Sequence, residues 1–312
     1  MVFKRLRYYT IIGILIVALV LGLAFGGSMA TATDNIQPEL PEQSLPTVPD
    51  DDTPDDDTED NNDTTETMPV FKNAYKLWEY SYDIFKNGKG YYAIMSGQAD
   101  ATIGTQYMYS VYKRNGPVSN YSDNLEISYR KGTSSFLDSS VLITYTDKTG
   151  LSYRQSTTNY VFAESYVIDT APTTFPYTEK FDWGERDVHD FLLNVTSKTS
   201  KLVYFDRTKD DYYEFKVTMN SDAVPSNYYN PVTGSPYVSH IPQESINISI
   251  TFKISKVNGH LLSYVLDEYF EVVPAGVLGV VGNQKTHNYI TYTFYEMDKE
   301  QNIENPFTEF GF

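Results

Sequence analysis

Histidine and carboxylate side chains are the groups through which this 312-residue chain could perform acid–base or metal chemistry. The four histidines are scattered along the chain, at His189, His240, His260 and His287. The chain has no HExxH zinc motif, no GxSxG nucleophile motif and no glycine-rich nucleotide-binding motif. Asp187 and Asp190 share a side of a predicted helix from which His189 points away, and Asp267 and Glu268 project to opposite faces of a predicted strand. We therefore expect no enzymatic activity, no metal site and no cofactor.

A run of aspartates offers a different chemistry, the binding of calcium. Residues 49–67 read PDDDTPDDDTEDNNDTTET, and residues 32–67 together carry 13 acidic and no basic side chains. A structured calcium loop needs a glycine at its turn and a bidentate acid at a set spacing, and this segment has neither. It also lacks the apolar side chains that would offset the entropy cost of ordering it. We expect residues 32–67 to form a disordered acidic linker.

An apolar loop between two predicted strands is a candidate binding site for an apolar ligand. Residues 272–282 read VVPAGVLGVVG, in which glycines separate the aliphatic residues Val277, Leu278, Val280 and Val281. Connections between strands are normally polar, so this loop is either a flexible lid that meets a lipid or a loop folded over the open end of the core.

The strands that precede this loop predict an apolar lining. Residues 245–272 form two alternating runs that meet at Asn258 and Gly259. A two-residue turn there would place every isoleucine opposite a polar residue, whereas a three-residue loop with Gly259 in the left-handed region moves the apolar residues to one face. That register pairs Ile254 with Leu262, Phe252 with Tyr264, Ile250 with Leu266 and Ile246 with Phe270. We therefore expect Ile250, Phe252, Tyr264 and Leu266 to contact a ligand, with Glu268 as a polar exception.

Two amphipathic helices and ten strands must position these residues. The helices are predicted from Asn73 to Gly88 and around Val188 to Val195. The strands are predicted at 91–97, 103–113, 125–130, 136–146, 151–162, 202–206, 212–219, 246–255, 261–273 and 288–296. One helix and five strands thus occur twice, which fits two similar domains or, as we favour, one domain. The expected fold is α+β, with one long curved antiparallel sheet of about ten strands packed on two helices.

Tyrosine is unusually frequent, with 28 residues in the chain. The amphipathic rings of tyrosine are suited to partly hydrated surfaces, where they could stack on sugars. Tyrosine is also common in β-strands without any binding role. The residues considered for sugar stacking are Tyr91, Tyr92, Tyr107, Tyr109, Tyr112, Tyr228 and Tyr229.

The N-terminus predicts export. Lys4, Arg5 and Arg7 precede an uncharged segment in which residues 8–30 could span a bilayer, while cleavage after Ala30 or Ala32 would release a secreted protein. We favour a single-pass anchor in the cell membrane, with the remainder outside the cytoplasm. The predicted divisions are a signal-anchor or signal peptide at 1–31, the acidic linker at 32–67 and an exported α+β domain at 68–312.

The charge and the cysteine content of the chain restrict the kinds of partner that it could bind. The formal net charge is −17, and no region offers a basic field for phosphates, so nucleic acid is not an expected partner. The chain has no cysteine, which excludes disulfides and a thiolate metal site. The expected partners are the membrane, through residues 8–30, and a lipid or apolar small molecule.

The closing pattern ITFKISKVNGHLLSYVLDEYFEV, followed by THNYITYTFYEMD and IENP, resembles the LolA-like half-barrel lipoprotein and lipid-carrier superfamily over residues 246–306. The resemblance implies a curved sheet that encloses lipids or other apolar ligands. This chain lacks the cysteine of the lipidated members, and a protein tethered to the membrane cannot carry a ligand from one membrane to another. The resemblance therefore implies ligand binding and does not imply transport. The sequence favours a membrane-tethered domain that binds an apolar or lipid-like ligand in a curved-sheet cavity. The alternative is a cell-surface interaction or structural module with a packed core and an exposed tyrosine patch.

Overall fold

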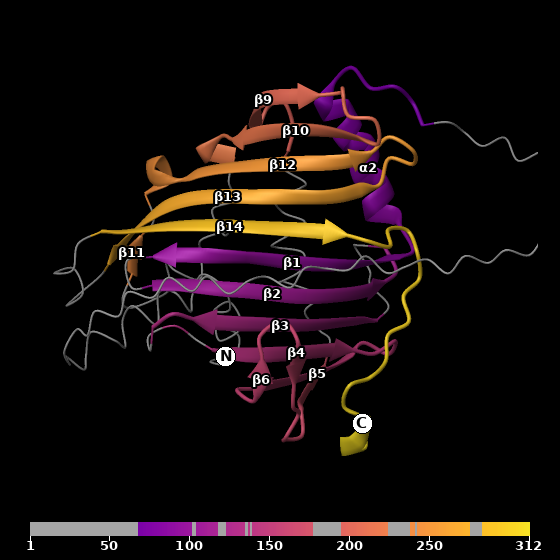
Figure 1. The fold of residues 1–312 in the computed structure, drawn as a ribbon, viewed down its shortest axis with the longest axis vertical. Coiled ribbons are helices and arrows are strands. Elements are labelled where there is room, and N and C mark those ends of the chain that lie inside the picture. Colours follow the sequence, from indigo (N-terminus) through magenta and orange to yellow (C-terminus); the bar gives the residue numbers. More distant parts are fainter. Residues whose placement is uncertain are drawn as a thin grey trace, which may run out of the picture.

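The computed structural model describes residues 68–101, 104–117, 123–134, 137, 139–176, 195–223, 238–240, 242–274 and 283–312. Within them lie one large antiparallel sheet and one α-helix, α2 (Ala74–Asn87), which crosses the strands near one end (Figure 1). The side chain of Asn73 caps this helix, because its Oδ1 accepts hydrogen bonds from the backbone nitrogens of Tyr75 at 2.9 Å and Lys76 at 3.1 Å. The first predicted helix is confirmed.

Two antiparallel meanders make up the sheet. The first comprises β1 (Gly90–Ala101), β2 (Gly104–Asn115), β3 (Asn124–Gly132), β4 (Ser140–Thr146), β5 (Leu151–Thr157) and β8 (Thr173–Pro176). The second comprises β9 (Ser200–Asp206), β10 (Tyr212–Met219), β12 (Asn247–Ser255), β13 (Leu261–Pro274) and β14 (Gln284–Phe294). Because β1 pairs with β14, the meanders join at their first and last strands and form one continuous sheet of order β8-β5-β4-β3-β2-β1-β14-β13-β12-β10-β9.

The single large antiparallel sheet is confirmed, and each of the ten predicted strands overlaps a strand of the structure, although the predicted strand 151–162 is divided between β5 and the short strand β6. The short strand β8 and the still shorter β11 (Val238–His240), which pairs with β13, were not predicted. Neither was the separate two-stranded sheet of β6 (Tyr160–Val161) and β7 (Ser165–Tyr166). Strands this short carry too few residues to show an alternation.

Several predicted segments lie outside the described residues. These are the signal-anchor at 1–31, the acidic linker at 32–67 and the second helix, of which only Val195 is described. In the part of the chain that the structure describes, no helix combines the length and apolar character needed to cross a membrane.

The hairpin of β12 and β13 has the predicted register along most of its length, but its loop is one residue longer than the predicted three-residue loop. The Ser255 backbone nitrogen donates a hydrogen bond to the His260 carbonyl oxygen at 2.9 Å, which leaves residues 256–259 in the loop. Gly259 has φ 74°, and Ile250 lies opposite Leu266 and Phe252 opposite Tyr264, as expected. The prediction is wrong at the last pair, because Ile254 faces Leu261 and not Leu262. The register shifts between Lys253 and Ile254, and this irregularity moves the partner by one position without turning the apolar row away from its face.

The apolar side of the sheet changes from one meander to the other. On the face that carries α2, here called the α2 face, buried apolar residues cover β10, β12, β13, β14 and β1. On β3 the same face carries Glu126, Ser128 and Arg130, as the registers through β2 require. The apolar residues of β3, β4 and β5 instead point to the opposite, outer face, where Phe307 of the C-terminal segment packs on them.

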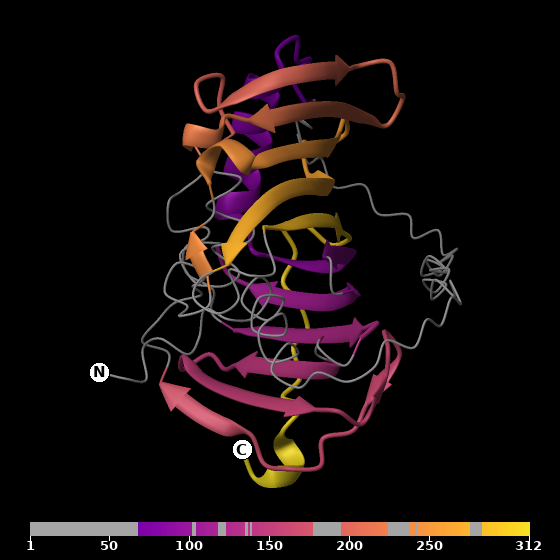
Figure 2. The same ribbon diagram turned by 90° about the vertical axis from the view of Figure 1, so that its left-hand side faces the viewer.

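One sheet therefore supports two cores on opposite faces. The first core includes Trp78 of α2, and the second includes Tyr129, Val141, Ile143, Tyr153 and Phe307. Figure 2 shows the curvature of the sheet, with α2 beside the strands of the second meander and the C-terminus near the strands at the other end. This division leaves the outer face of β12, β13, β14 and β1 with mainly polar and aromatic side chains, together with Ile94 and Val265.

Candidate binding site

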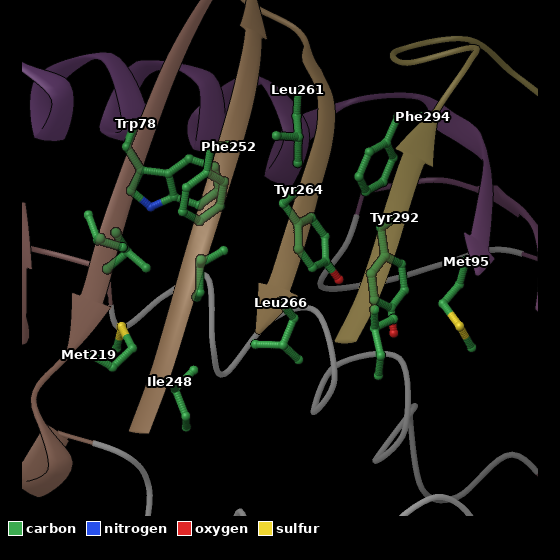
Figure 3. Close-up of a cluster of buried hydrophobic side chains, with 14 of the residues drawn as sticks. Trp78, Met95, Met219, Ile248, Phe252, Leu261, Tyr264, Leu266, Tyr292 and Phe294 are labelled. Carbon is green, nitrogen blue, oxygen red and sulfur yellow. The ribbon is translucent and has the colours of Figure 1, made fainter. Parts of the chain in front are cut away.

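The structure brings four of the predicted ligand-binding residues together. Ile250 and Phe252 on β12 and Tyr264 and Leu266 on β13 occupy neighbouring positions on the α2 face, and none is more than 6% exposed. The protein itself fills the space over two of them (Figure 3). The Trp78 ring centroid lies 4.5 Å from that of Phe252, and the Tyr292 ring stacks on Tyr264 at the same separation.

The apolar face continues beyond the reach of α2. Met95, Met219, Ile248 and Leu266 lie farther along the strands, away from the helix, and all are buried (Figure 3). The remaining predicted ligand residues, Val277, Leu278, Val280 and Val281, lie outside the described residues. The lid hypothesis for residues 272–282 therefore stays a prediction.

Glu268 is the polar exception in this apolar row, as the register predicted. It faces Ile248 across the strands and is 1% exposed. The Asn288 side chain on β14 donates a hydrogen bond to Glu268 Oε2 at 2.8 Å. Its neighbour Asp267 points to the outer face, so the expectation that these two carboxylates would not converge is confirmed.

A second buried carboxylate lies on the α2 face of the first meander. Burial raises the pKa of Glu126, and the positive charges of Arg114, Arg154 and Arg130 act in the opposite direction, as does a hydrogen bond from Ser128. Ser128 also shares a 2.6 Å hydrogen bond with Ser110 on β2. Arg114, Arg130 and Glu126 of this charged cluster are buried, and Arg154 is partly exposed.

The outer face of the central strands carries a different arrangement. Eight polar or aromatic residues from four neighbouring strands share this face, and we call them the outer patch: Gln98 and Asp100 on β1, His287 and Tyr289 on β14, Asp267 and Tyr269 on β13, and Asn247 and Ser249 on β12. Tyr269 is 48% exposed and Tyr289 is 47% exposed, although large aromatic side chains are usually covered. The outer patch lies on the side of the sheet opposite α2.

Direct contacts order the centre of the outer patch. His287 stacks on Tyr269, with ring centroids 4.0 Å apart and planes 5° from parallel. Its Nε2 lies 2.9 Å from Asp267 Oδ1, and the Tyr289 ring lies edge-on to the imidazole with centroids 6.4 Å apart. An aromatic strip of Tyr269, His287 and Tyr289 is thus bordered by a carboxylate whose oxygen orients the imidazole.

Polar groups continue this order onto β1. The Gln98 side chain donates a hydrogen bond to Asp100 Oδ2 at 2.9 Å, and Thr105 Oγ1 donates to Asp100 Oδ1 at 2.5 Å. Asp100 is the cross-strand neighbour of His287, and Gln98 is that of Tyr289. The strip therefore has hydrogen-bonding side chains on both flanks. Among the described residues no three histidine or acidic side chains are grouped so as to hold a metal ion.

The outer patch was not predicted from the sequence. Of the tyrosines considered for sugar stacking, Tyr91 and Tyr112 are buried, Tyr109 packs against the second core, and Tyr228 and Tyr229 lie outside the described residues. Tyr92 packs against Tyr295, and Tyr107 lies opposite Gln98 on the outer face, beside the outer patch. His287 appeared as one of four scattered histidines, because the strand pairing that brings it beside Tyr269 joins positions 18 residues apart. The usable signal was the alternation in THNYITYTF, which places His287 and Tyr289 on one face.

No family model matches the chain, and no curated protein matches it.

Proposed function

We propose that this protein is a non-enzymatic surface-binding module that holds neutral glycan chains on the outer patch. The observation that carries the proposal is the strip of Tyr269, His287 and Tyr289, which is flanked by hydrogen-bonding side chains and in which both tyrosines are about half exposed. This is a form of the interaction-module hypothesis, which expected exposed tyrosines on the polar face.

The chemistry of sugars matches this surface. A pyranose ring has C–H faces that pack on aromatic rings, and its hydroxyl groups both donate and accept hydrogen bonds. Tyrosine supplies a broad apolar ring at low conformational cost, together with a polar hydroxyl group. Asp267, Gln98 and Asn247 add acceptors and donors next to the rings.

The size and charge of the outer patch restrict the class of glycan that it could bind. Four adjacent strands span about 14 Å, which accommodates a few sugar units. The outer patch contains Asp100 and Asp267 and neither lysine nor arginine, so it disfavours acidic glycans. The outer patch lies on one face of a sheet, and such a face suits a polymer that passes across it.

A depletion assay tests this function. The full chain, in detergent micelles, is mixed with insoluble cellulose, chitin or mannan, and the protein left in solution is measured. We expect binding to at least one polysaccharide and loss of that binding in the Tyr269→Ala/Tyr289→Ala variant. Tyr295→Ala is the matched control, because Tyr295 is 37% exposed just beyond β14 and packs against Tyr92 outside the outer patch. Equal binding by the double variant and the control would contradict the proposal.

An apolar or lipid-like ligand on the α2 face is the second candidate. Its support is the apolar row through Ile248, Leu266 and Met219, which extends past α2 along the strands. This candidate keeps the resemblance to the LolA-like superfamily and the proposed membrane tether at residues 8–30. Mass spectrometry of solvent extracts from natively purified protein tests it, since a bound lipid would be extracted in stoichiometric amount. An extract without lipid, and no saturable binding of a fluorescent fatty acid, would oppose it.

A further inference from the structure

The two edges of the sheet differ in how well they are protected from pairing with another strand. Edge strands expose unpaired backbone groups, and proteins usually protect them with proline, charged side chains, bulges, short length or a covering segment. The β8 edge has four residues and ends in Pro176. The β9 edge has seven residues and no proline, and its middle residues Leu202, Val203 and Tyr204 are 38%, 56% and 38% exposed.

A bulge gives β9 an unusual arrangement of faces. Lys201 lies opposite Thr218 and Tyr204 opposite Lys216, while Val203 is the extra residue at the register shift. Pairing through β10 and β12 places Leu202 and Phe205 on the α2 face, and Lys201 and Asp206 on the outer face. About the midpoint between residues 203 and 204, Leu202 therefore shares a face with Phe205 and Lys201 shares a face with Asp206, which would not occur in a regular strand.

We propose that β9 pairs antiparallel with β9 of a second copy of this chain, about a twofold axis perpendicular to the sheet. In the register centred between residues 203 and 204, Lys201 of each copy faces Asp206 of the other on the outer face. Leu202 of each copy faces Phe205 of the other on the α2 face. Opposite charges and apolar side chains are thus matched at once, and the interface is self-complementary, as a twofold requires.

The acidic partner of this pairing is held in place by its own loop. Asp206 Oδ1 accepts hydrogen bonds from the Thr208 backbone nitrogen at 2.8 Å and from Thr208 Oγ1 at 2.7 Å. The carboxylate is therefore fixed at the end of β9 before any pairing, and little side-chain freedom is lost when Lys201 of a second copy approaches.

The arrangement has a consequence for binding that rests on the proposed glycan function. A twofold axis perpendicular to the sheet leaves the outer faces of both copies on the same side. Two outer patches would then face the same polysaccharide, and the dimer would bind by avidity where one copy binds weakly. The pairing itself does not depend on glycan binding and is tested without any sugar.

The test measures the molar mass of the full chain in detergent micelles by sedimentation equilibrium. We expect reversible dimers with a micromolar dissociation constant. Val203→Lys places a charge in the middle of the edge and should raise this constant at least about tenfold. Val161→Lys is the matched control, because Val161 is 51% exposed in β6, which lies beside the second core at the opposite end of the sheet from β9, and it should dimerise like the wild type.

Charge reversal tests the register. Lys201→Glu and Asp206→Lys should each weaken dimerisation alone, whereas an equimolar mixture of the two variants should restore it, because both ends of the mixed pair are then complementary. The proposal would be overturned if the wild type remained monomeric at all protein concentrations from 100-fold below to 100-fold above about 1 μM. Dimerisation of Val203→Lys at wild-type strength, or no recovery in the mixture, would also overturn it.

Discussion

Trp78 of α2 stacks over Phe252 of β12, with ring centroids 4.5 Å apart and planes inclined by 36°. Phe252 also stacks on Phe215 of β10, with centroids 4.9 Å apart. The single described α-helix is thus fixed to the second meander through aromatic contacts. The same contacts fill the part of the α2 face over Phe252, where an apolar ligand was expected. On the outer face of the central strands, Tyr269 and Tyr289 are 48% and 47% exposed.

The first prediction concerns this contact. Trp78→Ala should lower the free energy of unfolding by about 3–5 kcal/mol, because it removes a large side chain that is 3% exposed and leaves a cavity over Phe252. Chemical denaturation followed by circular dichroism measures the change. Val257→Ala should have almost no effect, since that side chain is 79% exposed. A similar loss of stability in both variants would contradict the assignment of Trp78 to the core.

Two glycines with positive φ give a matched comparison. Gly259 has φ 74°, and a Cβ there would lie 2.5 Å from Tyr80 Cε1 in α2, whereas a Cβ at Gly311, with φ 81°, would meet no described atom within 4 Å. Gly311→Ala should cost only the conformational strain, about 1–2 kcal/mol. Gly259→Ala should cost more, because the β12–β13 loop must also move away from α2. Equal losses in a urea titration would show that this close approach is absent.

The buried pair of Glu268 and Asn288 predicts a cost for losing one partner. Asn288→Ala removes the donor to Glu268 Oε2 and should destabilise the fold by about 1–3 kcal/mol. Asn302→Ala, at an exposed position, should be neutral. Thermal unfolding monitored by calorimetry gives both values. A neutral Asn288→Ala variant would mean that this hydrogen bond contributes no net stability.

Glu126 predicts a pH dependence of stability. Its pKa in the folded protein is raised above the ordinary value of 4.5, mainly by burial, so the folded state binds the proton more tightly than the unfolded state does. The tighter binding of this proton by the folded state stabilises the fold fully below pH 4.5, and the stabilisation is lost as the pH rises through the raised pKa of Glu126 in the folded state. Glu126→Gln should remove this loss, so that the stability of the variant relative to the wild type increases over that interval. Parallel pH profiles for the two proteins would contradict this account.

Local patterns were sufficient to predict most of the sheet. Alternation identified the long strands, and the requirement that Ile250 and Phe252 share a face with Leu266 and Tyr264 selected the correct register for most of the hairpin. The length of its loop was not predicted correctly, because a bulge next to Ile254 adds one residue to it. The pairing of β1 with β14 was not predictable in this way, because it joins strands at opposite ends of the domain. The change of apolar face near β3 follows from that pairing, so it too required the three-dimensional structure.

The candidate site was harder to predict than the fold. Apolar periodicity correctly grouped Phe252 and Tyr264, yet periodicity alone does not distinguish a ligand-lined surface from one covered by Trp78. The outer patch depends on residues from four strands, and each strand contributes only two of them. Tyr269 and His287 become neighbours only through the register of β13 and β14.

The most direct measurement is hydroxyl-radical footprinting of the full chain, with and without the soluble oligosaccharide of the polysaccharide that it binds. The account predicts that oxidation of Tyr269 and Tyr289 falls severalfold when the glycan is present, while oxidation of Tyr295 is unchanged. Unaltered oxidation of Tyr269 and Tyr289 at a saturating glycan concentration would contradict the assignment of glycan binding to the outer patch.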